Sequence, residues 1–520
     1  MGKNDLENRS EGYASPPDEG TKEPPFKIGQ TFLIGLGFMS AMLAWGMYNF
    51  YIPRILAGHF IGGEPFRVGY FTGDDALLYA NLLMTIDNIA AILLQPYFGE
   101  LSDRLRSKYG RRTPFLLLGI PISAISLFVM PYIQYLDTWT AMFVSMILVI
   151  LVFNLAMAFY RAPVVALMPD LTPSAHRSMA NVIINVMGGV GTAIGQVIPA
   201  IIGSLPFVLD NVTGYTTFEQ QDFVAMDTAV FGFTGMLMLV ILILYMVFVK
   251  EKPTGDKFWE VGQERIEIDP VTLDFVELDE EDMTAPEYSL VKETRGILSA
   301  TEKSAAYMFF GIMLWAASTD AFNNNFSLWG AEYVQLPDPL LGSFGLITSL
   351  FILILGYPGA KLSKEKGRLW TIRTGFFCMV LCYLLLIGVQ EIYRAGYTEI
   401  GLVLIITCFI LQTIGGALLA IAAIVVIWQL APKGKVGTYT GLYYVFRQAG
   451  SVVSPLVIGA LLSLFTRWIG RTSSWVILAP FCLFLAIIGF YCVYKVKRGE
   501  VGDELTERDL EELNRFYEED

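Results

Sequence analysis

Three ionisable residues lie deep inside long apolar stretches of this sequence, where a charge is costly unless it has a task or a partner. Asp87, Asp320 and Arg447 stand roughly ten, sixteen and eleven residues into stretches long enough to cross a bilayer. A carboxyl group in such surroundings can bind a cation on one side and release it on the other, because burial favours its neutral form. Asp87 and Asp320 are therefore candidate cation-coupling residues, and a structural ion pair with Arg447 is the alternative.

Polar and aromatic side chains accumulate in the same apolar stretches. Amides, a guanidinium and flat aromatic faces are what a binding site for a polyhydroxylated ligand needs. The candidate binding residues are Trp45, Tyr48, Asn49, Asn88, Asn185, Asn323, Asn324, Arg447 and Gln448. Trp45 and Tyr48 could equally be packing residues. Three consecutive asparagines (323–325) cannot share one helix face, so we expect one of them to be structural or the helix to be broken there.

Other charged residues stand near the ends of the apolar stretches. Glu332 is predicted to be an interfacial residue that reaches towards lipid headgroups. For Arg161, a structural role with Glu100, Asp103 or Asp170 competes with a contact to substrate. Asp170 is likewise a candidate for a structural or a coupling role.

The composition requires a membrane protein. Of 520 residues, 54% are hydrophobic and only 16% are charged, which is too little charge for the surface of a soluble protein of this size. The apolar stretches are continuous rather than alternating, so they predict helices and not a barrel. We predict an all-α polytopic membrane protein with twelve transmembrane helices, at 30–51, 77–100, 113–135, 138–162, 178–204, 227–249, 304–333, 341–362, 369–390, 400–430, 436–465 and 473–494.

A long polar stretch divides six predicted spans from six. It is rich in acidic residues and contains three prolines, which indicates a linker rather than a domain core. The predicted organisation is a cytoplasmic N-terminal tail (1–29), an N-terminal six-helix half (30–249), an acidic cytoplasmic linker (250–303), a C-terminal six-helix half (304–494) and an acidic cytoplasmic C-terminal tail (495–520).

The distribution of lysine and arginine predicts the orientation of the chain. Basic residues gather in the alternate loops 104–112, 361–368 and 433–435. Because positively charged loops stay on the cytoplasmic side, we expect both termini there and a multi-pass location in the plasma (inner) membrane. Three arginines fall on the other side, namely Arg394, Arg467 and Arg471. Most of the basic loop residues, but not all of them, therefore lie on the predicted cytoplasmic side.

The two predicted halves resemble each other. Val165–Pro173 aligns with Ile424–Pro432, and each stretch ends a span that is followed by a glycine-rich span. Pro199 and Pro455 occupy matching places in those following spans. Two repeated six-helix halves are typical of secondary transporters, whose binding site lies between the halves near the middle of the membrane.

The most specific string is Gly99–Phe115, which reads GELSDRLRSKYGRRTPF between the second and third predicted spans. Gly99 would permit close helix contact. Asp103 could pair with an arginine or accept backbone N–H groups at a helix start. Arg111 and Arg112 would hold the cytoplasmic face by their charge.

This string resembles the signature loop of the major facilitator superfamily. Together with Leu94–Gly99 and Tyr160–Leu171, it is similar to the sucrose–proton symporters and to the wider glycoside–pentoside–hexuronide:cation symporters. The resemblance implies alternating access and a gating loop. The residues of that implied loop are Gly99, Asp103, Arg104, Gly110, Arg111 and Arg112.

The chain departs from these relatives at their coupling residues. The plant symporters carry an aspartate in the fourth span, whereas here 138–160 holds no acid and Asn154 is the nearest polar residue. The melibiose-type branch uses aspartates in the second span, where this chain has Ala91 and Gln95, with an acid only at Asp87. The family's coupling residue therefore cannot be carried over to this chain.

We expect a cation-coupled symporter, driven by protons or by sodium, for a disaccharide or glycoside such as sucrose or maltose. The alternatives are an exporter of drugs or another small solute, and a transporter-like membrane sensor. Expected partners are the sugar and the lipid bilayer, without nucleic acid, and the chain is expected to be a monomer. No catalytic, metal or cofactor site is predicted, because the two histidines, His59 and His176, stand in or near loops and there is no nucleophile constellation.

Overall fold

The residues that the structure describes fold almost entirely into helices. The computed structural model describes residues 27–61, 64–67, 71, 73–172, 177–203, 220–262, 266–268, 275–277, 294–297, 302–336, 338–431 and 436–499. The two predicted tails and most of the predicted linker therefore lie outside the described residues. So does the side chain of Asp87, although its backbone is helical.

The N-terminal half consists of six long helices. They are α2 (Ile28–Ala57), α3 (Ala76–Arg104), α4 (Thr113–Val129) with the 3-10 turn η1 (Met130–Tyr135), α5 (Trp139–Asp170), α6 (Arg177–Gly203) and α8 (Gln220–Phe248). Several helices continue past the predicted spans. The clearest case is α5, whose predicted end at 162 reflects where apolar residues stop rather than where backbone hydrogen bonding stops.

The C-terminal half repeats this design. It comprises α10 (Ser304–Leu328) with the π-helical turn η4 (Trp329–Val334), α11 (Asp338–Lys366), α12 (Arg368–Arg394), α13 (Thr398–Leu430), α14 (Val436–Ile469), α15 (Arg471–Ser474), the 3-10 turn η5 (Trp475–Ile477) and α16 (Leu478–Lys495). Within the described residues, nine helices are long and apolar enough to cross a membrane. The long helices outside that set are α3, α6 and α11, so the count of twelve spans stays a prediction.

Short strands mark the two ends of the molecule. At one end, β1 (His59–Ile61) and β2 (Glu64–Arg67) form an antiparallel hairpin; we call this the hairpin end. At the other, the linker end, β3 (Leu105–Arg106) pairs with β4 (Glu260–Val261), and β5 (Ile266–Ile268) pairs with β6 (Phe275–Glu277).

The start of the predicted linker is part of the N-terminal half. The ring of Trp259 lies 4.9 Å from that of Phe115 and 6.0 Å from that of Phe159, measured between centroids. Together with the pairing of β3 and β4, this fastens 251–262 onto the N-terminal half. The local composition does not predict this contact, because the apolar partners of Trp259 lie about a hundred residues or more away in sequence.

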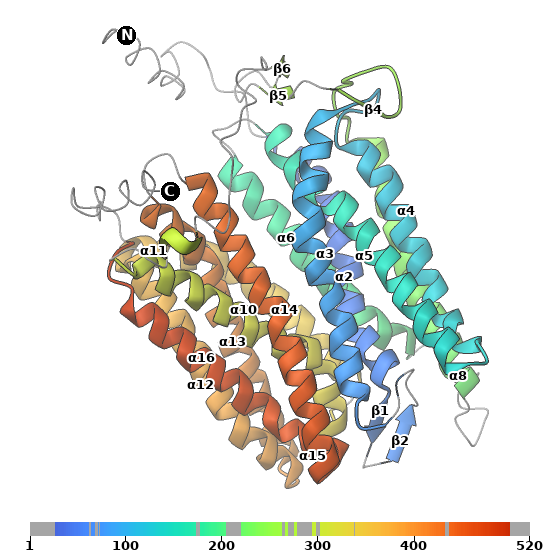
Figure 1. Cartoon of the computed structure of the whole chain (residues 1–520), viewed down its shortest axis with the longest axis vertical. Coiled ribbons are helices and arrows are strands. Elements are labelled where there is room, and N and C mark those ends of the chain that lie inside the picture. Colours follow the sequence, from blue (N-terminus) through green and yellow to red (C-terminus); the bar gives the residue numbers. More distant parts are fainter. Residues whose placement is uncertain are drawn as a thin grey trace.

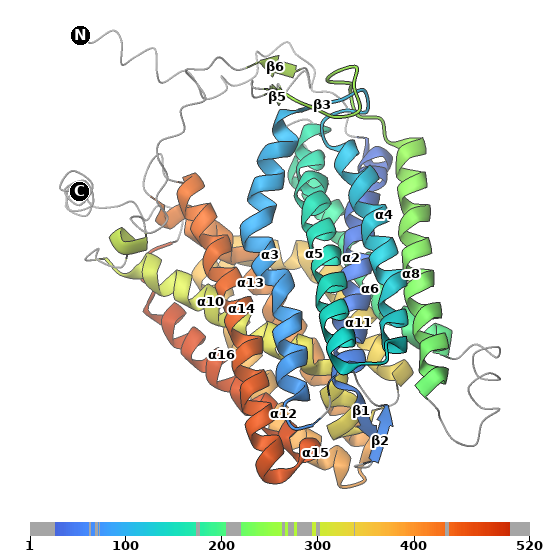
Figure 2. The same cartoon turned by 45° about the vertical axis from the view of Figure 1, so that its right-hand side comes forward.

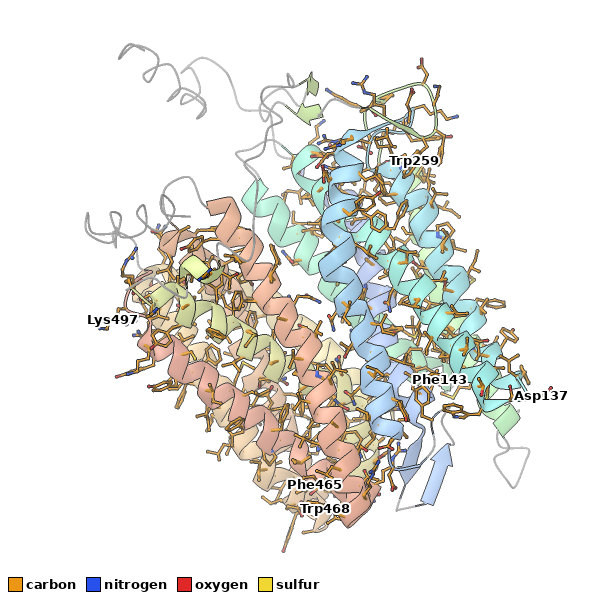
Figure 3. All side chains as sticks on the ribbon, viewed as in Figure 1. Asp137, Phe143, Trp259, Phe465, Trp468 and Lys497 are labelled. Carbon is orange, nitrogen blue, oxygen red and sulfur yellow. The ribbon has the colours of Figure 1, made fainter. Side chains whose placement is uncertain are left out.

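The two halves meet at the hairpin end and separate towards the linker end (Figures 1 and 2). Helix α3 packs against α14, and α6 packs against α11, across the boundary between the halves. In Figure 3, Asp137 and Phe143 mark the hairpin end of one half, and Phe465 and Trp468 mark it on the other. Trp259 and Lys497 mark the linker end of the two halves.

The glycines of α6 pack within one half. A Cβ added at Gly191 or Gly195 would collide with the backbone of α2 at Met39 or Leu43. These glycines bring α6 and α2 together inside the N-terminal half. Their contacts lie within one half, and not on the surface between the halves.

Candidate functional site

A chain of hydrogen bonds crosses between the halves near the middle of the helices. The Ser451 hydroxyl on α14 donates to a carboxylate oxygen of Asp320 on α10. The Asn88 amide on α3 donates to the Ser451 carbonyl at 3.3 Å, and the Gln448 amide donates to Asn88 Oδ1 at 2.6 Å. We call Asp320, Ser451, Asn88 and Gln448 the mid-depth chain. It brings together three predicted site residues and adds Ser451, which sequence reasoning missed.

Arg447 lies beside this chain and above an indole ring. Its guanidinium carbon is 5.4 Å from the centroid of Trp315 on α10, in cation–π geometry. The positive charge of Arg447 is close enough to act on the Asp320 carboxylate. Among the described side chains, the direct partner of Asp320 is the hydroxyl of Ser451, so the predicted ion pair with Arg447 is not formed in this conformation.

A similar pair stands in the N-terminal half. The Arg161 guanidinium carbon on α5 is 5.4 Å from the ring centroid of Trp45 on α2. Asn49 is half-buried one turn from Trp45. Tyr48, by contrast, is fully buried and stacks on Phe153 at 4.9 Å, which is the packing role considered as its alternative.

The structure separates the three consecutive asparagines. Asn323 is exposed and Asn324 is half-buried, whereas Asn325 is 1% exposed. The side chains of Asn325 and Asn81 on α3 exchange two hydrogen bonds of 3.0 Å. A Cβ at Gly459 on α14 would stand 2.8 Å from Asn81, so α3, α10 and α14 are in close contact here. Asn325 is thus the structural member of the run.

Of the remaining predicted residues, Asn185 on α6 is exposed. Asn154, the residue nearest to the missing acid of the fourth span, is 2% exposed. Both of its amide atoms lack a hydrogen-bond partner among the described residues.

Polar contacts close the hairpin end across the halves. Arg467 at the end of α14 binds both carboxylate oxygens of Asp75 at 2.8 Å, and Ser463 donates to the same carboxylate. These two partners, Ser463 first, hold the pKa of Asp75 below its usual range. Nearby, Arg54 on α2 donates to the carbonyl of Ser327 at the end of α10, at 3.2 Å.

The prediction for Glu332 was wrong. The residue lies in η4 and is fully buried, where it accepts hydrogen bonds from Arg471 at 2.7 Å and from the Trp475 indole at 2.6 Å. Arg471 also donates to the carbonyl of Gly58 in the other half, at 3.0 Å. A charged residue near the end of an apolar stretch suggests an interface, but the partner that draws it inward is more than a hundred residues away.

At the linker end, charges are paired inside the N-terminal half. Arg112 binds Asp103 and, at 2.9 Å, Asp170. Arg111 binds Asp170 at 2.8 Å, whereas Arg104 forms an exposed pair with Glu100. Asp103 and Asp170 together more than offset the burial of Arg112 and raise its pKa. Asp170 therefore pairs with the loop arginines, while Arg161, one of its predicted partners, lies over Trp45.

Glu251 completes this network, and sequence reasoning missed it. Its carboxylate accepts hydrogen bonds from the backbone N–H groups of Arg111, Arg112 and Thr113, at 2.9–3.0 Å. It thereby caps the start of α4, where Arg112 at the N-cap position makes no side-chain cap of its own. A helix start without its own cap was the signal available in the sequence.

Two glycines of the loop have different roles. Gly110 has φ +93°, and a Cβ there would collide with the Glu251 side chain, so the turn requires glycine. Among the described residues, a Cβ at Gly99 would meet Ala162 alone, at 3.9 Å, which is an ordinary contact. The expected close helix contact at Gly99 is therefore not found among them, and the Gly99 carbonyl accepts the Ser102 hydroxyl at 2.7 Å.

Comparison with known proteins agrees with this architecture. A sequence model of the Major Facilitator Superfamily matches residues 34–407 and 308–515. The sucrose transport protein SUC3 of Arabidopsis thaliana is 27% identical over 132 residues. That match covers 22% of this chain, and the chain spans only 22% of the relative's length.

Solved structures share the fold at low sequence identity. A bacterial homologue of the human lysosomal transporter Spinster, in an inward-facing and occupied conformation, is 12% identical with a TM-score of 0.64. The match covers 94% of this chain and all of that one. The nucleoside transporter NupG is 16% identical with a TM-score of 0.57, over 90% of this chain and all of NupG.

Proposed function

Because this chain belongs to the major facilitator superfamily and is a membrane transporter rather than an enzyme, we propose that it is a secondary active transporter that carries a sugar together with a cation. The sugar is a disaccharide or glycoside such as sucrose or maltose. The partial likeness to a sucrose transport protein supports this choice of substrate class.

The observation that carries the proposal is the mid-depth chain. A carboxylate at this depth is costly and is retained where it has a task. Asp320 is joined through Ser451 to Asn88 of the other half, so a change in its charge reaches the boundary along which the halves must move. Ion binding and rearrangement of the halves can thus be linked through Asp320, the hydroxyl and carbonyl of Ser451, and the amide of Asn88.

The coupling ion in this proposal is a proton. Sodium prefers several oxygen ligands, whereas the described neighbours of Asp320 are a hydroxyl that donates and the cation Arg447. When Asp320 is protonated, the negative charge near Arg447 is lost, and the guanidinium can donate to the hydroxyl groups of a ligand. Asp87, one residue before Asn88, is the second candidate for carrying the ion.

We propose that the chain is a monomer that spans the plasma membrane. Its linker end then lies in the cytoplasm. The basic loop 104–112 lies at that end, as the charge bias of cytoplasmic loops requires. With the hairpin end closed and the halves apart at the linker end, the conformation described here faces inward. Opening of the hairpin end then gives alternating access to the same site.

Uptake into proteoliposomes tests the proposal. With an inside-alkaline pH gradient, labelled sucrose or maltose should accumulate, and a proton ionophore should abolish the accumulation. Asp320→Asn should abolish gradient-driven accumulation while leaving exchange of sugar across the membrane, which needs no gradient. Absence of gradient-dependent accumulation for every sugar would overturn the proposal, and accumulation driven only by sodium would overturn the choice of ion.

A further inference from the structure

Each half carries one tryptophan with an arginine over its ring. Trp45 lies under Arg161 in the N-terminal half, and Trp315 lies under Arg447 in the C-terminal half, both at 5.4 Å. In each pair the two residues come from different helices of the same half, α2 with α5 and α10 with α14. The pairs are therefore held by helix packing, and each moves with its own half.

Both indoles also carry an unused hydrogen-bond donor. The Nε1 atoms of Trp45 and Trp315 are buried and have no hydrogen-bond partner among the described residues. The side chain of Trp315 is 6% exposed as a whole, so water compensates little for this missing bond. A buried donor without an acceptor costs free energy, and a ligand hydroxyl that accepts the hydrogen bond would remove this cost.

The two pairs lie at comparable depths. Arg54 on α2 contacts Ser327 on α10 at the hairpin end. Trp45 stands nine residues before Arg54, and Trp315 stands twelve residues before Ser327. At about 1.5 Å per residue, the indoles lie roughly 14 and 18 Å from that closed contact, on the side where the halves separate (Figure 2).

The Trp45 side chain lies on a distinct face of α2. A Cβ at Gly46 would collide with Thr192, which places that side against α6, and Tyr48 packs on Phe153 of α5. At 100° per residue, Trp45 and Asn49 share the face between those two directions, and both are half-buried. In the other half, Arg447 adjoins Gln448, which already contacts Asn88 across the boundary.

We propose that these pairs are two subsites of one binding site for a two-ring glycoside, with one ring held at Trp45–Arg161 and the other at Trp315–Arg447. The inference rests on the proposed sugar transport and assigns the residues that hold each ring. An indole offers a flat apolar face to a sugar ring, and a guanidinium offers several donors to its hydroxyls. A ligand with two rings engages both halves at once, which a single ring at one subsite does not.

Titration calorimetry of the purified full-length protein with sucrose, maltose and methyl α-glucoside tests the two-subsite inference. The wild type should bind at least one of the disaccharides at least tenfold more tightly than methyl α-glucoside. Trp45→Leu and Trp315→Leu should each abolish this difference, because each leaves one subsite. The double variant should bind the disaccharide more weakly than either single variant, because it lacks both subsites. The Phe variants keep a ring face and lose the donor, so they should keep part of the difference.

Trp329→Phe is the matched control. The Trp329 indole nitrogen is also buried without a partner among the described residues, but its ring packs on Phe322 and Phe326. This variant should leave the ratio of affinities unchanged. Equal affinity for one and two rings, or Leu variants that keep the wild-type ratio, would overturn the two-subsite inference while sugar transport stands. If no sugar binds and none is transported, the proposed function itself fails.

Discussion

The linker end and the hairpin end of this molecule are both held by charged and polar side chains, but in different ways. At the linker end, Arg111, Arg112, Asp170 and Glu251 all belong to one half. At the hairpin end, the bonds of Asp75 to Arg467, of Asn81 to Asn325 and of Arg54 to the Ser327 carbonyl join the two halves.

The two kinds of bond affect two different properties, the stability of each half and the balance between conformations. Bonds inside one half persist while the halves move, so they set stability. Bonds between halves must break when the hairpin end opens, so they set the balance between conformations. Substitutions at the linker end should therefore lower the unfolding temperature, and substitutions at the hairpin end should change the separation of the halves.

The largest effect is expected from Asp170→Ala at the linker end. It removes the Asp170 carboxylate from the buried guanidinium of Arg111 and one of the two carboxylate partners of Arg112, which should cost about 3–5 kcal/mol. Thermal unfolding of the purified protein measures the loss. Glu100→Ala removes the exposed partner of Arg104 in the same loop and should cost under about 0.5 kcal/mol. Equal losses in the two variants would contradict the assignment.

A smaller loss is expected from Gly110→Ala. The residue has φ +93° and its new Cβ would displace Glu251 from the start of α4, so a cost of about 2–3 kcal/mol is expected. Gly470→Ala is the control, because its φ is +82° and its surroundings are open within 4 Å. The control should cost about 1 kcal/mol for backbone strain alone. If both variants lose the same free energy of unfolding, the collision with Glu251 does not contribute to the loss.

Asn81→Leu should change conformation more than stability. It removes both hydrogen bonds between the side chains of Asn325 and Asn81 in the closed hairpin end and leaves the Asn325 amide only its bond to the Ala321 carbonyl. The expected cost is about 1–3 kcal/mol, or roughly tenfold in population per 1.4 kcal/mol. Spin labels at the exposed positions Asp137 and Trp468 should move apart, and labels at Lys108 and Lys497 should approach. Adding Asn325→Leu should largely reverse the shift, since two apolar partners leave no amide unpaired.

The smallest effect is expected from acid at the hairpin end. Because the pKa of Asp75 is lowered, its contact contributes above the usual carboxyl pKa of about 4 and is lost as pH falls through the lowered value. The carboxylate is partly exposed, so the closed population should fall only a few-fold at low pH. Asp75→Asn should remove that part of the pH dependence. An unchanged pH profile in this variant would assign the effect to another group.

The sequence predicts the positions of the helices better than it predicts the contacts between distant segments. Long apolar stretches locate the helices because each satisfies its own backbone locally. The β1–β2 hairpin and the fastening of 251–262 depend on contacts that no local pattern records. Residues 251–262 follow the predicted boundary at 249 but pack against the N-terminal half.

The candidate site follows the same rule. Asp320, Asn88, Arg447 and Gln448 stand out because polar residues are rare in such surroundings. Ser451 does not, since a serine in a helix usually bonds to its own backbone, and its bond to Asp320 spans 131 positions in sequence. Glu332 stood out but was misassigned, because its partners Arg471 and Trp475 are also remote.

The contact between Asn88 and α14 lies near the middle of α3, where a tilting helix would have its pivot. From Asn88, helix α3 extends thirteen residues to Asp75 and sixteen to Arg104, or roughly 20 and 24 Å at 1.5 Å per residue. These are arms of nearly equal length, so a tilt about Asn88 moves both ends by similar distances in opposite directions. A rotation of about 25° would shift each end by roughly 10 Å. Such a tilt would close one end as it opens the other, once the bonds of Asp75 and Asn81 across the halves are broken.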